Sequence, residues 1–163
     1  MAEVDVSRIA LAAERAVEGS LARLDRYLAF APISSESDAP KTVGALAEAL
    51  KVDLEKLGFS GARVLTLPDA LPCVAAEWNK AGADKPTILI YGHFDVQPVK
   101  NEVWATEPHK IVRKGDRIYG RGSADDMGGW LSHLVAIEAW IAETDGLPCN
   151  LKLLLEGEEE IGS

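Results

Sequence analysis

A β-branched and apolar run, Thr87 to Tyr91, is followed at once by Gly92-His93-Phe94-Asp95-Val96-Gln97-Pro98. The run has the composition of a buried strand, so His93 and Asp95 should lie at its carboxyl end. In open α/β sheets, ligands bind at that edge. An imidazole and a carboxylate two residues apart in this position are typical of a metal ligand and the group that orients it.

The composition is that of a globular protein with one domain. The chain has 163 residues, 47% of them apolar, which is enough for a hydrophobic core. No segment is apolar over the length of a membrane span, and Met1 to Ser7 lack the features of a secretory signal. We therefore expect a cytoplasmic protein in which Cys73 and Cys149 are reduced. The net charge of −9 argues against nucleic acid or an anionic membrane as a partner, because both require clustered Lys and Arg.

Hydrophobic periodicity predicts helices and strands that form a single layered α/β unit. One helix has the stripe Val17, Leu21, Leu24 and Leu28, and a second has apolar positions from Val43 to Leu57 and ends at Gly58. A third helix is expected from Asp126 to about Thr144. Strands are expected at Arg63–Leu67, Cys73–Trp78, Thr87–Tyr91, His109–Arg113, Arg117–Tyr119 and Asn150–Glu156.

A second polar cluster, Gly120-Arg121-Gly122-Ser123-Ala124-Asp125-Asp126, delivers two adjacent aspartates to the start of the third helix. Helix capping is one interpretation, but a single aspartate would be enough for it. A dinucleotide-binding loop is another, but Asp125 occupies the place of the third glycine and would repel phosphate.

A third cluster follows the last predicted strand and contains Glu156, Glu158, Glu159 and Glu160. Such a run is often a solvated surface. Here the strand before it is apolar enough to be central, so its end should reach the edge that holds His93 and Asp95. Imidazole and carboxylate ligands together suit a divalent ion such as zinc, and a shared carboxylate can bridge two ions. A free glutamate beside them could act as the general base.

The three segments 93–98, 120–126 and 156–163 resemble the ordered signatures of the co-catalytic zinc amidohydrolases. That family includes carnosine dipeptidase, aminoacylase, carboxypeptidase G and succinyl-diaminopimelate desuccinylase. The resemblance covers nearly the whole chain, including the stretch from Trp104 to Pro108. It implies a three-layer α/β/α sandwich with a central mixed sheet, and two Zn²⁺ ions, with Mn²⁺ or Co²⁺ as alternatives.

The resemblance also implies a role for each matching residue. His93 would bind one zinc ion, and Asp95 would fix the tautomer of its imidazole. Asp125 would bridge the two ions, and Glu160 would bind the second. Glu159 would be the general base.

Other residues near these motifs are not implied to be ligands. The family joins Asp125 to Asp126 by a cis peptide bond, and Asp126 does not coordinate the metal. His109 and His133 match no family ligand, so we expect them to be ordinary surface or core residues. Met127 departs from the lysine of many relatives, which leaves the charge balance at that helix start open but does not affect the ligands.

The chain supplies three ligands, whereas two zinc ions that share one carboxylate need about five. The family takes the remaining acid and histidine from later sequence, together with a lid domain that supports dimerisation. We therefore expect residues 1–163 to be the amino-terminal part of a catalytic domain that is inactive alone and belongs to a homodimeric parent.

The predicted activity of the full-length parent is metal-dependent hydrolysis of an amide bond in a dipeptide or short peptide. One alternative is deacylation of an N-acyl amino acid, as in deacetylases and desuccinylases. A second alternative, in which residues 1–163 are an inactive metal-binding or partner-binding module, follows from the missing ligands.

Overall fold

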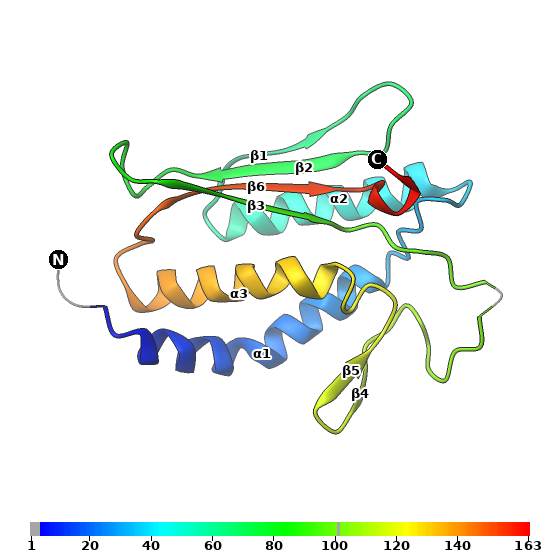
Figure 1. Cartoon of the computed structure of the whole chain (residues 1–163), viewed down its shortest axis with the longest axis horizontal. Helices are drawn as coiled ribbons and strands as arrows, with labels where there is room; N and C mark the ends of the chain where they lie inside the picture. Colours follow the sequence, from blue (N-terminus) through cyan, green and yellow to red (C-terminus); the bar gives the residue numbers. More distant parts are fainter. Residues whose placement is uncertain (1–3, 101) are drawn as a thin grey trace.

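The computed structural model describes residues 4–100 and 102–163. A four-stranded sheet with the order β1-β2-β6-β3 lies at its centre (Figure 1). Its strands are β1 (Ser60–Leu65), β2 (Cys73–Trp78), β3 (Thr87–His93) and β6 (Asn150–Glu156). β2 pairs antiparallel with both β1 and β6, whereas β3 and β6 are parallel. The parallel pair places His93 opposite Glu156, so two of the predicted polar clusters meet at one edge.

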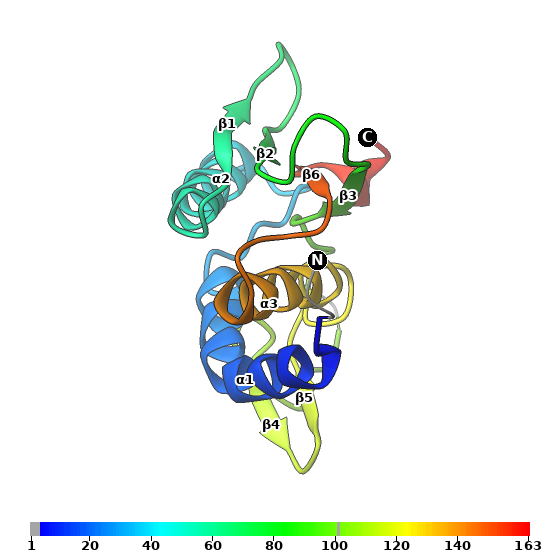
Figure 2. The same cartoon turned by 90° about the vertical axis from the view of Figure 1, so that its left-hand side faces the viewer.

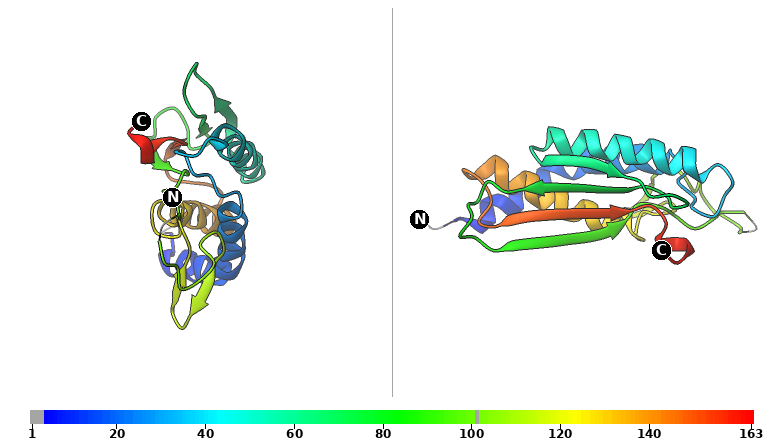
Figure 3. Two further views of the ribbon diagram at one scale, coloured as in Figure 1. Left: turned by 90° about the vertical axis from the view of Figure 1, so that its right-hand side faces the viewer. Right: turned by 90° about the horizontal axis from the view of Figure 1, so that it is seen from above.

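The helices α1 (Val6–Leu28), α2 (Ala39–Lys56) and α3 (Met127–Glu143) all cover the same face of the sheet (Figure 2). The strand residues that point toward them are buried, namely Val74, Ala76, Trp78, Leu151, Leu153 and Leu155. On the opposite face Leu89 and Tyr91 are 63% and 54% exposed, and no described helix covers them (Figure 3, right). The predicted mixed α/β sheet is confirmed, and the described residues supply it with one helix layer.

Helices α1 and α3 lie side by side. Tyr27 of α1 contacts both α3 and α2. The rings of Tyr27 in α1 and Trp130 in α3 are 5.8 Å apart. The Tyr27 hydroxyl also donates a hydrogen bond of 2.8 Å to Asp53 of α2. Both aromatic rings are buried, so the three helices and the sheet share one core.

A separate hairpin, β4 (Val112–Lys114) and β5 (Arg117–Tyr119), precedes α3 and turns at Gly115, which has φ +60°. The strand predicted at 109–113 was wrong at its start, since His109 lies in a turn and the strand begins at Val112. The predicted end of the second helix at Gly58 is confirmed, because α2 stops just before it and Gly58 has φ +87°. Among the described residues, no helix has the length and apolar character that crossing a bilayer requires.

Candidate metal centre

Three predicted ligands converge at the carboxyl end of the sheet. His93 is the last residue of β3, Asp125 lies in the loop before α3, and Glu160 lies in the short 3-10 helix η1 (Glu159–Ile161) that follows β6. One ligand atom from each lies within 4.8 Å of the other two. One nitrogen and two carboxylate oxygens form a donor set that fits Zn²⁺ or a similar divalent ion.

The cluster is open to solvent on one side. The side chain of His93 is 8% exposed, whereas that of Asp125 is 79% exposed, and 3.0 Å separates His93 Nε2 from Asp125 Oδ1. Burial lowers the pKa of the His93 imidazole, but hydrogen bonds with Asp95 and Asp125 outweigh it and raise the pKa to about 9. The surroundings of Nε2 therefore favour a positive charge, as a cation site requires.

The first turn of α3 holds the main chain of His93. Its N–H donates to Asp126 Oδ2 at 3.3 Å, and its carbonyl accepts from Trp130 Nε1 at 2.9 Å. A Cβ atom at Gly92 would lie 2.6 Å from Asp126 Oδ2 and 2.9 Å from Trp130 Cδ1. Glycine is therefore required at this position for β3 to approach α3 so closely.

Asp125 and Asp126 face different partners. The peptide bond between them is cis, as the resemblance implies. Asp125 contacts the imidazole of His93, whereas Asp126 contacts its main-chain N–H. The two aspartates thus hold the ring and the backbone of the same histidine.

Asp95 connects the ends of β3 and β6. It is completely buried, and its Oδ1 lies 3.4 Å from His93 Nδ1, close enough to orient the ring. Its carboxylate also accepts the backbone N–H groups of Glu159 at 3.2 Å and Glu160 at 3.1 Å. Burial raises the pKa of the Asp95 carboxyl, but the hydrogen bonds from His93 and from the Glu160 backbone outweigh it and hold the pKa below its usual value. The contact of Asp95 with the turn that contains Glu159 and Glu160 was not predicted from the sequence.

Glu159 lies beside the ligand cluster with its side chain half exposed. Its Oε2 is 3.7 Å from His93 Nε2. A carboxylate in this position is close enough to the cluster to share a water molecule with a bound ion, as a general base must.

Two further side chains contact segments around the site, and these contacts were not predicted from the sequence. Gln97 Nε2 donates to the carbonyl of Glu160 at 3.0 Å and to its Oε2 at 2.8 Å. Glu158 Oε2 accepts the N–H of Leu71 at 2.9 Å and so fastens the loop between β1 and β2. The signal for Gln97 was its spacing, because His93, Asp95 and Gln97 alternate along an extended segment and so fall on one side.

The stretch from Trp104 to Pro108 packs on the loop that carries Asp125. The Arg121 guanidinium lies 5.1 Å from the centre of the Trp104 ring, and the Arg121 N–H donates to the Pro108 carbonyl at 2.6 Å. His109 and His133 do not belong to the ligand cluster.

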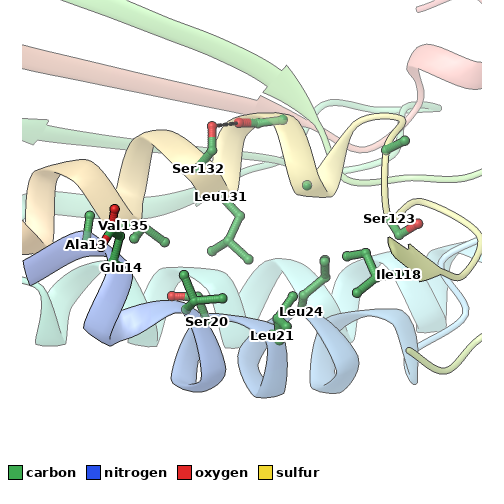
Figure 4. Close-up of a pocket in the computed structure, with 14 residues that line it drawn as sticks. Ala13, Glu14, Ser20, Leu21, Leu24, Ile118, Ser123, Leu131, Ser132 and Val135 are labelled. Atoms are coloured by element: carbon green, nitrogen blue, oxygen red, sulfur yellow. Dashed lines mark hydrogen bonds between the residues drawn. The ribbon is translucent and has the colours of Figure 1, made fainter. Parts of the chain in front are cut away.

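A groove of about 460 Å³ lies between α1 and α3, behind the Asp125 loop (Figure 4). Its lining is mainly apolar and includes Leu21 and Leu24 of α1 and Leu131 of α3, and Glu14 is its one ionisable lining residue. With one carboxylate and no imidazole in its lining, it lacks the groups for the predicted chemistry.

The known protein sequences that resemble this chain are a peptidase family, dipeptidases and a desuccinylase. Residues 89–163 match the family described as Peptidase family M20/M25/M40. The chain is 34% identical over 139 residues to the Beta-Ala-His dipeptidase of Mus musculus, covering 85% of this chain and 27% of that protein. It is 38% identical over 110 residues to the cysteinylglycine-S-conjugate dipeptidase of Corynebacterium striatum, covering 67% and 24%. A succinyl-diaminopimelate desuccinylase of Delftia acidovorans is 33% identical over 131 residues, covering 78% and 34%. The chain thus spans about a quarter to a third of the length of these relatives.

Solved structures give the same result. The chain superposes on the dipeptidase Dug1p of Saccharomyces cerevisiae with a TM-score of 0.88 and 27% identity, covering 98% of this chain and 36% of that one. Human carnosine dipeptidase 1 gives 0.80 and 26%, covering 99% and 36%. An M20 metallo-carboxypeptidase of Sulfolobus solfataricus gives 0.77 and 38%, covering 88% and 32%. The family match over residues 89–163 and the shared fold together identify a domain of Peptidase family M20/M25/M40 in this chain.

Proposed function

We propose that the complete protein hydrolyses the amide bond of a dipeptide or short peptide in a metal-dependent reaction. The observation that carries this proposal is the convergence of His93, Asp125 and Glu160 with Glu159 at their side. The relatives named as dipeptidases, at 34% and 38% identity, support this substrate class.

In this proposal His93, Asp125 and Glu160 would hold two zinc ions, with Mn²⁺ or Co²⁺ as alternatives, and Asp125 would contribute to both. When bound, the ions polarise the scissile carbonyl and lower the pKa of a water molecule. Glu159 would accept a proton from the attacking water and deliver it to the nitrogen of the departing amine, so that the amide and water become an acid and an amine. Asp95 keeps Glu159 and Glu160 in place by accepting both of their N–H groups.

We also propose that the remaining ligands come from further sequence, since three ligands are fewer than the about five that a shared two-metal site needs. Residues 1–163 are then the amino-terminal part of the catalytic domain. The homodimer is proposed from the resemblance alone. A cytoplasmic location is supported by Cys73 and Cys149, which are both free thiols.

The substitution Glu159→Gln in the complete protein tests the assignment of the base. Because glutamine cannot accept the proton, we expect kcat to fall by about 10² to 10⁴-fold while bound metal is unchanged. The assay follows hydrolysis of β-alanyl-histidine and cysteinyl-glycine with Zn²⁺ added.

Glu158→Gln is the matched control, since it keeps an oxygen that can accept the N–H of Leu71. We expect it to leave kcat close to that of the wild type. Near-normal turnover of Glu159→Gln would show that the base has been wrongly assigned.

Deacylation of an N-acyl amino acid is a second candidate, favoured by the 33% identity to a desuccinylase. Comparing dipeptides with acetyl- and succinyl-amino acids on the complete protein separates the two. A higher kcat/KM for the acyl amino acids would favour this candidate over the dipeptidase.

A further inference from the structure

The side chain of Gln97 makes two contacts with Glu160, a predicted metal ligand. Its Nε2 donates to the Glu160 carbonyl at 3.0 Å and to the Glu160 Oε2 at 2.8 Å. One contact fixes the main chain of the ligand and the other fixes its carboxylate. Together they restrict rotation of a side chain that is otherwise free about several bonds.

The orientation of the Gln97 amide is determined by its partners. A glutamine amide can be placed with its nitrogen and oxygen exchanged, so its orientation needs a chemical argument. Both partners here are oxygens, a carbonyl and an ionised carboxylate, and neither can donate. Only the NH₂ group can therefore face Glu160, and one of its bonds is to a charged acceptor.

Gln97 acts together with Asp95, two residues before it. The Asp95 carboxylate accepts the N–H groups of Glu159 and Glu160, and Gln97 adds the contacts to the Glu160 carbonyl and carboxylate. The same extended segment begins at His93, which contributes the nitrogen ligand. The segment 93–97 therefore sets the distance between a ligand on β3 and a ligand beyond β6.

We infer that Gln97 is a positioning residue of the metal centre, which holds the Glu160 carboxylate toward His93 and Asp125. This inference rests on the proposed metal-dependent function and adds a residue to it. Because Gln97 is exposed, its amide does not contribute to the hydrophobic core. Both of its side-chain hydrogen bonds are donated to Glu160.

The test compares two amide-to-apolar substitutions of similar size in the complete protein. Gln97→Met removes both hydrogen bonds and keeps the length of the side chain. Asn79→Leu is the control, because Asn79 Nδ2 donates to Glu77 Oε2 at 2.8 Å in an exposed amide–carboxylate pair outside the metal centre. Each protein is titrated with Co²⁺ in competition with a chromophoric chelator, and the visible absorption of bound Co²⁺ is recorded at saturation.

We expect Gln97→Met to bind Co²⁺ about 10-fold more weakly and to change its visible spectrum, since partners of metal ligands contribute about 10 to 100-fold to affinity. Asn79→Leu should match the wild type in both measurements. Thermal unfolding in the presence of chelator should be the same for both variants, which separates positioning from a loss of folding.

Unchanged affinity and spectrum for Gln97→Met would overturn the inference, as would an equal loss in Asn79→Leu. A wild-type protein that binds no Co²⁺ would overturn this inference and the proposed metal chemistry together. A wild-type protein that binds Co²⁺ but hydrolyses neither dipeptides nor N-acyl amino acids would overturn the proposed reaction alone, and the affinities would still decide the role of Gln97.

Discussion

At the scale of single residues, the site depends on positions where a side chain would not fit. Gly92 and Gly129 border the carboxylate of Asp126, and a Cβ at Gly129 would collide with Asp126 Oδ1. Asp126 in turn bonds the N–H of His93 and is joined to Asp125. A side chain added at either glycine would therefore displace Asp126, which is bonded to the N–H of His93 and follows Asp125 in the chain.

Gly92→Ala tests this dependence. The added methyl group collides with Asp126 and Trp130, and overpacking of this kind costs about 1–3 kcal/mol of unfolding free energy. We expect a lower Tm and weaker Zn²⁺ binding, measured by calorimetry with and without metal. Gly44→Ala in α2 is the control, since a Cβ there meets nothing within 4 Å and should stabilise the helix by about 0.5–1 kcal/mol. Equal Tm and Zn²⁺ affinity in Gly92→Ala and wild type would contradict the role given to this glycine.

A polar contact joins α1 to α2. Asp53 of α2 accepts hydrogen bonds from Tyr27 and Arg26 at the end of α1. Burial raises the pKa of the Asp53 carboxyl, but the hydrogen bonds from Arg26 and Tyr27 outweigh it, so its pKa lies below the ordinary value of 3.8. A lowered pKa stabilises the folded state above the unfolded-state pKa, and this contribution is lost as the pH falls through the folded-state value.

Asp53→Asn should therefore reduce stability at pH 7 by about 1 kcal/mol and reduce it less in acid. The measurement is urea unfolding of both proteins at pH 7 and at a series of pH values below 3.8, across which the wild type loses this contribution. Asp116→Asn in the turn between β4 and β5 should leave both values unchanged. A difference between Asp53→Asn and wild type that does not shrink in acid would argue against this ion pair.

Element boundaries could be predicted where local pattern decides them. The predicted bounds of β2, β5 and β6 match the structure, because each is a short β-favouring run between turn residues. The strand predicted from His109 begins later, because the N–H of Ile111 is bonded by Asp25 of α1 at 2.6 Å instead of by a neighbouring strand. A contact between residues so far apart in the chain leaves no local signal.

The same limit applies to the candidate site. His93, Asp125 and Glu160 could be placed at one edge because each follows a recognisable strand or turn, and parallel pairing of β3 and β6 brings two of them together. The hydrogen bonds that Asp95 and Gln97 make with Glu159 and Glu160 could not be predicted. They depend on how η1 folds back over the end of β3, which is a tertiary arrangement.

Within residues 4–100 and 102–163, the sheet of the molecule has an open edge and an uncovered face. β3 is its last strand, and Leu89 and Tyr91 are exposed on the face that no described helix covers. Exposed edges and apolar faces promote association between chains. This arrangement agrees with the proposal that further sequence completes both the fold and the metal centre.

Residues 1–163 produced alone should therefore hydrolyse no dipeptide and should self-associate. Leu89→Lys should reduce the self-association, because it places a charge on the edge strand. Leu67→Lys is the control, since Leu67 is 73% exposed in a loop outside the sheet and its substitution should have no effect. Light scattering measures association, and hydrolysis of β-alanyl-histidine with added Zn²⁺ measures activity. A monomeric, Zn²⁺-dependent dipeptidase made of these residues alone would show that the three ligands suffice, and the proposed need for further sequence would be wrong.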